Sequence, residues 1–345
     1  MPPPTEAQLA AREDWVIDWL DRRMDVVDGL VTRGGADPLG WLGLQRQVRT
    51  FTRQAATVPR ARSSARVVAA LDDHVADLAT AGARADAELA AAGPAAAAEA
   101  RSRLGIRLAL IGKGGAGKTV TSSTLARLLA RRGRKVLAVD LDVNPGLAIS
   151  LGLPPTEAGL PPGAIEEATS APYGWQLAAG LSPEEAVERH AAVAPDGVRF
   201  LGLGKIGTAD KEVARRSVAA VRQILLGFSD PEWDVIADLE AGPTTPFEGY
   251  HDFSDHVLMV VGPAWRSAMT ARRLLPMVDD RRLTVVYNRF RDEADHPGLP
   301  PDIRIPNDPE LTQAEREGRA PVDACPDSPA IRAVEQLADL ILSGG

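Results

Sequence analysis

The stretch GKGGAGKT at residues 112–119 decides the fold of this 345-residue chain. It satisfies the pattern G-x-x-x-x-G-K-[ST], which is typical of a phosphate-binding loop. The apolar run RLALI (107–111) precedes the loop, and the helical stretch TVTSSTLARLLARR follows it and ends at Gly133. Glycines let the backbone wrap around an anion so that successive N–H groups converge on it. The flanking strand and helix disfavour the alternative, a glycine-rich turn that binds nothing.

The side chains of this loop predict nucleotide chemistry. We expect the Lys118 ammonium to lie on the β- and γ-phosphates of a nucleotide, and the Thr119 hydroxyl to bind Mg²⁺. The helix that starts here adds its partial positive charge to the site. The nucleotide-binding residues predicted from the loop are Gly112, Lys113, Gly114, Gly115, Ala116, Gly117, Lys118, Thr119 and Val120.

Short apolar runs alternate with helical stretches from residue 106 onward. Such runs are typical of a parallel sheet that is buried on both faces. The strands expected from them are 107–111, 135–140, 198–203, 234–239, 256–261 and 283–288. The fold class predicted is therefore α/β, a P-loop NTPase whose mostly parallel sheet is flanked by helices.

The first 104 residues have a different, helical pattern. Apolar residues recur at three- and four-residue steps in helices expected at about 5–32, 41–56 and 62–91, with a Gly/Pro break at 34–40. The alanine-rich stretch 91–101 is predicted to be a linker or a poorly anchored helix. We therefore expect a smaller all-helical N-terminal domain over 1–104 and the P-loop domain over 105–345.

Acidic residues follow two of the expected strands. Asp140 and Asp142 lie at a strand end, where ligands bind in α/β sheets. One of them can help to hold Mg²⁺ through water while the other orients an attacking water, although Asp can equally cap a turn. Asp238 ends another strand and fits a Mg²⁺-binding carboxylate, and Glu240 and Gly242 begin a loop that can respond to a γ-phosphate.

A second lysine, Lys113, stands near the start of the phosphate loop, so that the chain reads KGGAGKT over 113–119. This is the mark of the deviant Walker A group, and the chain resembles the ParA/MinD (SIMIBI) family of P-loop ATPases. Within that family it looks most like the MinD-like ATPases that mature carbon monoxide dehydrogenase. The resemblance covers about residues 106–340 and implies that Lys113 reaches across a dimer interface to the partner's nucleotide. The alternative is a solvated loop lysine.

The same resemblance implies roles for the acidic residues. The family pattern D-x-D-x-N matches residues 140–144, and D-x-E-A-G matches residues 238–242. It implies that Asp142 positions or activates water, that Asp140 supports the metal and that Asp238 is the Walker B carboxylate. The catalytic residues predicted are Lys113, Lys118 and Asp142, and the metal ligands are Thr119, Asp140 and Asp238.

The base-binding side is predicted from the C-terminal part. Asn288 lies at another strand end, where its amide can donate to and accept from a purine edge. A GTP-reading site would have Asn-Lys-x-Asp, whereas this chain has NRFR at 288–291, which favours ATP. The family has a stretch closely similar to 305–330, and the resemblance implies Pro306, Asn307 and Asp308 around adenine and ribose.

One feature of the resembled subgroup is missing. Its nickel-associated members carry Cys-x-Cys soon after a Gly-Lys-Ile segment, whereas this chain continues GKIGTADK over 204–211 without cysteine. A metal relay is therefore not predicted. The single Cys325 excludes an internal disulfide and a Cys-rich metal site, and we expect it to be structural. His251 and His256 are expected to be ordinary surface or packed residues.

Charge is unevenly distributed along the chain. The net charge is −8, with 34 Arg and only five Lys, which argues mildly against a nucleic-acid coat. Residues 38–71 nevertheless hold six arginines and no acid. Arg46, Arg49 and Arg53 would share one helical face. They could form a phosphate or nucleic-acid patch. We favour the alternative, an intramolecular contact, for example with the acidic first helix.

These observations favour an ATP-hydrolysing molecular switch that uses Mg²⁺, forms a homodimer with ATP and acts on a protein client. The alternative is a DNA- or partner-positioning module in which the arginine stretch binds and ATP controls assembly. A third hypothesis is a P-loop synthetase or kinase. The sequence shows no secretory signal, no apolar run of membrane-spanning length and no basic amphipathic C-terminal helix, so a cytoplasmic protein without membrane docking is expected.

Overall fold

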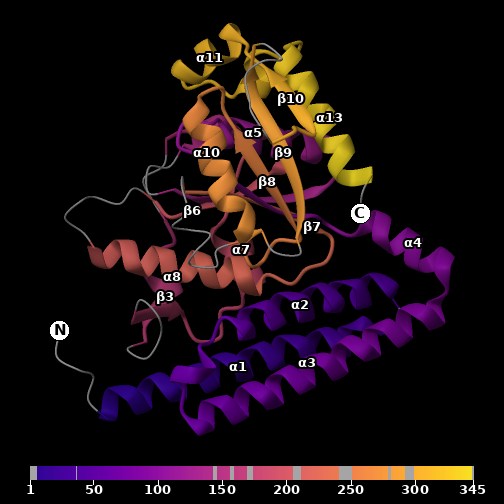
Figure 1. Ribbon diagram of the computed structural model, residues 1–345, viewed down its shortest axis with the longest axis vertical. Coiled ribbons are helices and arrows are strands. Elements are labelled where there is room, and N and C mark those ends of the chain that lie inside the picture. The colour runs from indigo at the N-terminus through magenta and orange to yellow at the C-terminus, as the bar shows by residue number, and fades with distance from the viewer. Residues whose placement is uncertain are drawn as a thin grey trace.

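An eight-stranded sheet organises the C-terminal two-thirds of the chain (Figure 1), in the order β10-β9-β8-β1-β7-β2-β6-β5. The computed structural model describes residues 6–35, 37–142, 146–155, 159–168, 174–204, 211–240, 251–278, 281–291 and 299–343. The strands are β1 (Arg107–Gly112), β2 (Lys135–Leu141), β5 (Ala192–Val193), β6 (Arg199–Gly202), β7 (Trp233–Leu239), β8 (His256–Val261), β9 (Arg282–Phe290) and β10 (Ile303–Pro306). All neighbours pair in parallel except β5 with β6, so the predicted fold class is confirmed.

Two strands of this sheet and a separate hairpin were not expected from the sequence. The edge strand β10 is short and carries the exposed Arg304, and both residues of β5 are exposed, so neither gives a continuous apolar run. The hairpin pairs β3 (Ile165–Glu167) with β4 (Trp175–Leu177) in antiparallel register. These segments owe their strand geometry to pairing with a neighbour more than to their own composition.

Helices cover both faces of the sheet. One core is formed with α5 (Lys118–Arg131), α6 (Leu147–Leu151) and α13 (Pro329–Ser343), and the other with α7 (Pro183–His190), α8 (Lys211–Gly227) and α10 (Trp265–Leu274). Within β1, Leu108 and Leu110 belong to the first core, whereas Ala109 and Ile111 belong to the second. This alternation follows from the two-residue period of a strand and explains why β1 is apolar from Leu108 to Ile111. The short helices α11 (Pro309–Arg316) and α12 (Pro321–Ala324) follow β10.

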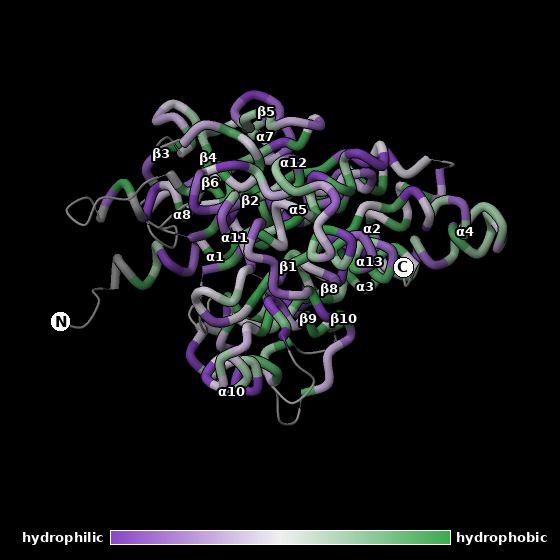
Figure 2. The backbone as a smooth tube through the Cα atoms, turned by 90° about the horizontal axis from the view of Figure 1, so that it is seen from above, coloured by the Kyte–Doolittle hydropathy of each residue, from purple (hydrophilic) through white to green (hydrophobic). Residues whose placement is uncertain are grey.

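Three long helices, which we call the helical layer, run side by side below the sheet in Figure 1. They are α1 (Glu6–Gly34), α2 (Pro38–Ala56) and α3 (Ala65–Ala92), and the shorter α4 (Pro94–Arg103) leads from them to β1. Seen from above, α4 lies at one end of the molecule, on the side of the C-terminus (Figure 2). The helical layer has its own core, which includes Leu44, Phe51 and Leu78.

Two details of the helical prediction were wrong. The Gly/Pro break is shorter than 34–40, because the Asp37 side chain caps α2 by accepting from the Leu39 N–H at 3.0 Å and Pro38 occupies its first turn. The alanine-rich stretch forms α3's last turn and α4, and it is anchored, since Ala97 and Ala100 are buried. The predicted boundary near residue 104 falls between α4 and β1.

The arginines of α2 hold the helical layer against the sheet. Arg46 is only 5% exposed, its Nε donates to Asp255 Oδ2 at 2.7 Å and its Nη2 donates to the Gly105 carbonyl at 2.5 Å. Arg53 donates to the Ser254 carbonyl at 3.3 Å. These contacts lie at the entry to β1 and β8, which is the amino-terminal edge of the parallel sheet.

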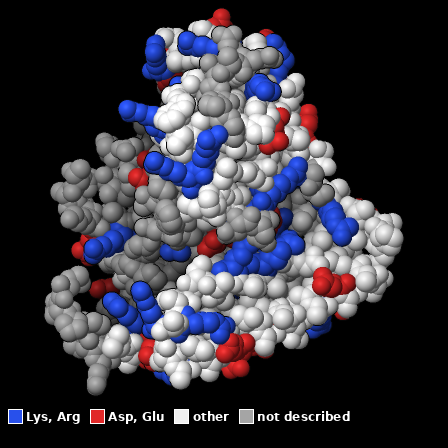
Figure 3. Space-filling model, in the orientation of Figure 1, with Lys and Arg blue, Asp and Glu red and all other residues white. Residues whose placement is uncertain are grey.

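These contacts decide between the two interpretations of the arginine stretch. Arg46 faces the protein, so its assignment to a nucleic-acid patch is wrong and the intramolecular interpretation is confirmed for it. Its partner is Asp255 rather than the acidic first helix, whose Asp14 pairs with Arg66 at 2.6 Å. Other Lys and Arg side chains gather on the surface along the seam between the helical layer and the sheet (Figure 3). Among the described helices, none combines the length and apolar character that crossing a bilayer requires.

Candidate functional site

The phosphate loop leaves the carboxyl end of β1, between β7 and β8. Gly117 adopts φ +96°, and a Cβ there would overlap the Asn288 amide nitrogen, so this position requires glycine. α5 begins at Lys118 with no side-chain hydrogen bond capping its first turn. Its first backbone N–H groups therefore point toward the loop and are available to an anion, as the sequence predicts.

Lys118, Thr119 and Asp238 are brought together at this edge. Lys118 is 7% exposed, and the Thr119 hydroxyl donates to Asp238 Oδ2 at 2.5 Å. Asp238 Oδ1 is buried and has no hydrogen-bond partner among the described residues. Burial, together with the nearby Asp140 carboxylate, raises the pKa of Asp238 to about 7, although Thr119 and Lys118 oppose this shift. A buried carboxylate oxygen without a partner, beside a threonine hydroxyl, suits Mg²⁺ or its water.

Asp140 lies directly beside Asp238, because the two residues are register partners on β2 and β7. Its carboxylate accepts from the backbone N–H groups of Asp142 at 3.0 Å, Gly146 at 3.1 Å and Leu147 at 3.0 Å. Burial raises the pKa of Asp140 to about 6, against the effect of these N–H groups. In this structure Asp140 holds the ends of the loop that carries Asp142, and its metal-supporting role stays a prediction. Asn144 lies outside the described residues.

The described part of the chain offers few clustered carboxylates for direct metal binding. Within the described ranges, no group of three or more His, Cys, Asp or Glu side chains could hold a metal ion. A site built from Thr119 and Asp238 would therefore depend on phosphate oxygens and water for its other ligands, which is how Mg²⁺ is usually held beside nucleotides. The residues present fit that arrangement. Glu240 is described, whereas Gly242, the other residue of the predicted switch loop, lies outside the described residues.

The end of β9 braces the phosphate loop from the side. Asn288 is 8% exposed, its Nδ2 donates to the Ala116 carbonyl at 2.8 Å and its Oδ1 accepts from the Arg289 N–H at 2.9 Å. Arg289 adopts φ +58°, and its guanidinium donates to the Gly115 carbonyl. Sequence reasoning missed Arg289, for which an arginine after a strand-end Asn is the only available signal. The purine contact predicted for Asn288 stays a prediction.

The other base-binding candidates lie where β10 leads into α11. Pro306 ends β10, and the Asn307 N–H donates to the Phe290 carbonyl at 2.9 Å. The Asp308 carboxylate caps α11 by accepting from the Glu310 N–H at 2.9 Å, and it also accepts from the Ser328 hydroxyl. The structure thus gives Asp308 a capping function, and the nucleotide contacts of all three candidates remain predictions.

The remaining candidates are placed as follows. Lys113 is half-buried at the start of the loop, and among the described residues no hydrogen bond or ion pair engages its ammonium. His251 and His256 are packed side chains, with Nε2 atoms 2.9 Å from the Met277 carbonyl and 2.8 Å from the Thr284 hydroxyl. Cys325 follows α12, where burial raises the pKa of its thiol.

The residues that form this site lie in a range that matches a known protein family. Residues 108–322 match the CobQ/CobB/MinD/ParA nucleotide binding domain, which is more than half of the chain. The chain belongs to the CobQ/CobB/MinD/ParA family. The predicted ParA/MinD resemblance is thereby confirmed, and the P-loop, β2 and β7 all lie inside the matched range.

Several known proteins resemble half to two-thirds of the chain. An uncharacterized ATP-binding protein of Methanocaldococcus jannaschii is 28% identical over 255 residues, which are 69% of this chain and 98% of that protein. The carbon monoxide dehydrogenase accessory protein CooC of Rhodospirillum rubrum is 28% identical over 183 residues, 51% of this chain and 70% of CooC. The structure of the septum site-determining protein MinD from Pyrococcus horikoshii, complexed with Mg-ADP, has a TM-score of 0.52 and 20% identity over 69% of this chain and 96% of that chain.

Proposed function

We propose that this protein is an ATP-hydrolysing molecular switch that dimerises around its nucleotide and acts on a protein client. The observation that carries the proposal is the cluster of Lys118, Thr119 and Asp238 beneath the uncapped start of α5, with one buried oxygen of Asp238 lacking a partner among the described residues. The lysine and the backbone N–H groups are suited to bind phosphate, and the Thr119 and Asp238 oxygens are suited to bind Mg²⁺ or its water. Within the described part of the chain, no side chain caps the start of α5 and no group bonds to Asp238 Oδ1.

Each residue then has a defined task. Lys118 and the α5 N–H groups bind and orient the β- and γ-phosphates, and the Thr119 and Asp238 oxygens hold the metal site, Asp238 through water. Mg²⁺, when bound with ATP, neutralises phosphate charge and so eases attack at the γ-phosphorus. Asp142, placed by the hydrogen bonds of Asp140, accepts a hydrogen bond from the attacking water and aims it.

The proposed dimer rests on Lys113. Its ammonium is not engaged by any described residue of its own chain, so it is available to the nucleotide of a facing copy. We also propose that residues 1–104 and 105–345 are separate domains, and that the first of them selects the client. The carbon monoxide dehydrogenase accessory role of CooC is not transferred to this protein, because its sequence lacks the Cys-x-Cys of the resembled subgroup.

The proposal is tested by measuring phosphate release and molar mass with ATP, with ADP and without nucleotide. We expect a dimer with ATP only, and hydrolysis that is slow and depends on Mg²⁺. Asp142→Ala should bind ATP and stay dimeric without turnover, Lys118→Ala should lose ATP binding, and Lys113→Ala should bind ATP but remain a monomer. Lys135→Ala is the matched control, since that exposed lysine lies at the far end of β2 from the phosphate loop and pairs there with Glu232. Binding of ATP with no change of mass in any variant would rule out the switch.

A further inference from the structure

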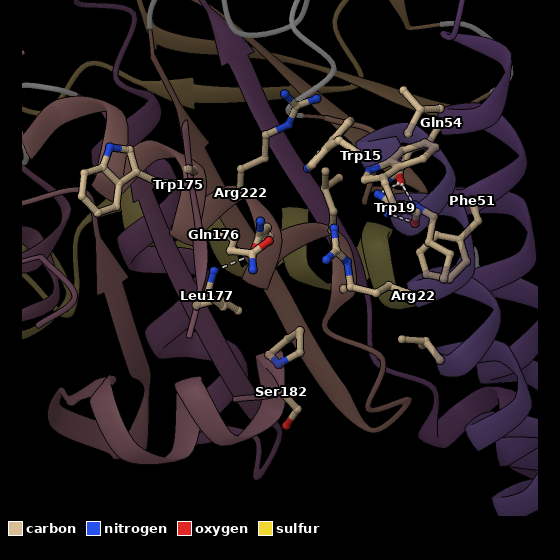
Figure 4. A pocket seen from close by; sticks show the side chains of 18 of the residues that line it. Trp15, Trp19, Arg22, Phe51, Gln54, Trp175, Gln176, Leu177, Ser182 and Arg222 are labelled. Atoms are coloured by element: carbon tan, nitrogen blue, oxygen red, sulfur yellow. Dashed lines mark hydrogen bonds between the residues drawn. The ribbon is translucent and has the colours of Figure 1, made fainter. Parts of the chain in front are cut away.

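A cavity of about 720 Å³ lies between the helical layer and the sheet part (Figure 4). Its described walls come from α1, the end of α2, the segment 175–183 and α8. None of the residues 112–120 is among this described lining, so the cavity is distinct from the phosphate loop. The volume lies within the range of sites that bind small organic molecules.

Aromatic side chains form two opposite walls of this cavity. Trp15, Trp19 and Phe51 lie on the side of the helical layer, and Trp175 lies on the side of the β3–β4 hairpin (Figure 4). The rings of Trp15 and Trp19 are 6.1 Å apart, with an angle of 34° between their planes. Both tryptophans are half-buried rather than packed away, so part of their ring surface is available to an apolar or aromatic body.

Three guanidinium groups line the same space: Arg22, Arg23 and Arg222. Arg23 stacks on the Trp19 ring with its guanidinium carbon 3.6 Å from the ring centroid. Burial lowers the pKa of Arg23 well below its usual value, and Arg222 and Arg22 lower it further. Arg222 and Arg22 therefore lie close enough to Arg23 to repel its charge.

The carboxylates near the cavity have arginine partners of their own. Asp252, the carboxylate among the described lining residues, pairs with Arg281 at 2.9 Å. Arg22 pairs with Asp18 at 2.5 Å on the exposed side of α1. The described lining of the cavity thus holds three arginines and one aspartate, a balance that favours an anionic ligand over a cationic one.

Two buried hydrogen-bond donors beside the cavity lack acceptors within the described part of the chain. Gln54 is 3% exposed, and its Oε1 accepts from Arg23 Nε at 2.8 Å, which leaves its Nε2 to donate. Neither Gln54 Nε2 nor Trp15 Nε1 has a hydrogen-bond partner among the described residues. Both groups are donors, and both belong to residues that line the cavity. The cavity therefore combines cations and unused donors, which calls for acceptor oxygens.

We propose that this cavity is a binding site for a small amphipathic organic anion, whose apolar or aromatic body lies between Trp19 and Trp175 and whose carboxylate or phosphate faces Arg22, Arg23 and Arg222. A small molecule fits better than a peptide, because the space accommodates a drug-sized ligand and is bounded by walls on both sides. The site goes beyond the proposed ATPase function and does not depend on it. Since its walls come from both the helical layer and the sheet part, a bound anion would also stabilise their contact.

The test uses two fluorescent probes that share one aromatic body. 8-Anilinonaphthalene-1-sulfonate carries an anionic group, and N-phenyl-1-naphthylamine lacks it. Each is titrated into the full-length protein with saturating ADP and Mg²⁺ present, so that the nucleotide site is not available to the probe. We expect the anionic probe to bind a single site per chain, to raise the thermal midpoint and to bind at least about tenfold more tightly than the neutral probe.

Matched variants locate the site. Arg22→Gln and Arg222→Gln should each weaken the anionic probe about tenfold while leaving the neutral probe unchanged. Arg12→Gln makes the same change at an exposed position of α1 outside the described lining and should alter neither. Ala178→Trp, at a half-buried lining position, should block both probes. Circular dichroism of each variant confirms that it is folded.

Three outcomes would overturn the proposal. Equal affinity for the two probes would remove the role of the cations, and unchanged binding by folded Arg222→Gln and Ala178→Trp proteins would place the probe elsewhere. Binding of a polyglutamate peptide with none of the anionic probe would show that the cavity is a peptide-docking surface instead. The same measurements on Lys118→Ala without ADP separate this site from the ATPase, because loss of ATP binding there should leave probe binding intact.

Discussion

The ion pair between Arg46 and Asp255 is predicted to be the main polar attachment of the helical layer, and its two halves should differ in importance. The Arg46 side chain is 7% exposed, whereas that of Asp255 is 28% exposed. Asp255→Asn leaves a buried guanidinium without its counter-charge, so we expect it to lower the free energy of unfolding by about 4 kcal/mol. Arg46→Met leaves a carboxylate that water can reach and inserts an apolar chain into the space, so we expect a smaller loss of about 2 kcal/mol.

Urea denaturation followed by far-ultraviolet circular dichroism measures both losses. Arg49→Met is the control, because this exposed arginine lies one turn further along the same helix and should cost less than about 0.5 kcal/mol. In the double variant the two losses should not add, since either change alone breaks the same contact. ATP affinity should stay unchanged, because the pair lies at the opposite edge of the sheet from the phosphate loop. A larger loss for Arg46→Met than for Asp255→Asn would refute this reasoning, as would losses below about 1 kcal/mol for both.

Three further predictions concern the loop and a buried histidine. Asn288→Ala removes the brace on the Ala116 carbonyl and should weaken ATP and GTP about tenfold and equally in fluorescence titrations, whereas selective weakening of ATP would indicate base reading instead. Gly117→Ala should abolish nucleotide binding, since its Cβ would meet Asn288 at a positive φ, while Gly163→Ala, which has open space around it, should bind normally. Burial lowers the pKa of His256 to about 4. The unfolded chain then binds more protons than the folded one between pH 6.5 and 4. As the pH falls through that range, the free energy of unfolding of the wild type should therefore drop by about 3 kcal/mol more than that of His256→Gln. Urea melts in which the two proteins show parallel pH profiles would contradict this.

The central sheet was predictable because its strands are apolar on both faces. A buried strand such as β8 is apolar at every residue from Val257 to Val261, and this leaves a clear apolar run in the sequence. The phosphate loop was equally readable, because its glycines and lysine have few other uses in that order. The two carboxylates, Asp140 and Asp238, followed from the same logic, since parallel strands end at one edge.

Other features depend on partners that a sequence does not specify. β10 forms because β9 offers it an edge, and of its own four residues Ile305 alone is buried. The inward direction of Arg46 depends on Asp255, which is more than 200 residues away. The sequence does carry a signal for the start of α2 at Pro38, because Asp followed by Pro is typical of a helix start. The expected Gly/Pro break at 34–40 nevertheless included these two residues. Tertiary pairing, rather than local preference, decided most of the differences.

The strand β1 joins two places that the sequence separates by only a few residues. At its entry the Gly105 carbonyl is held by α2, and at its exit Gly112 opens the phosphate loop. Its six residues span about 20 Å as an extended rod that is hydrogen-bonded to β7 on one side and β8 on the other. Such a rod cannot bend or lengthen by itself. A displacement that passes along β1, from the phosphate loop to the helical layer, would therefore require a concerted shift of all three strands.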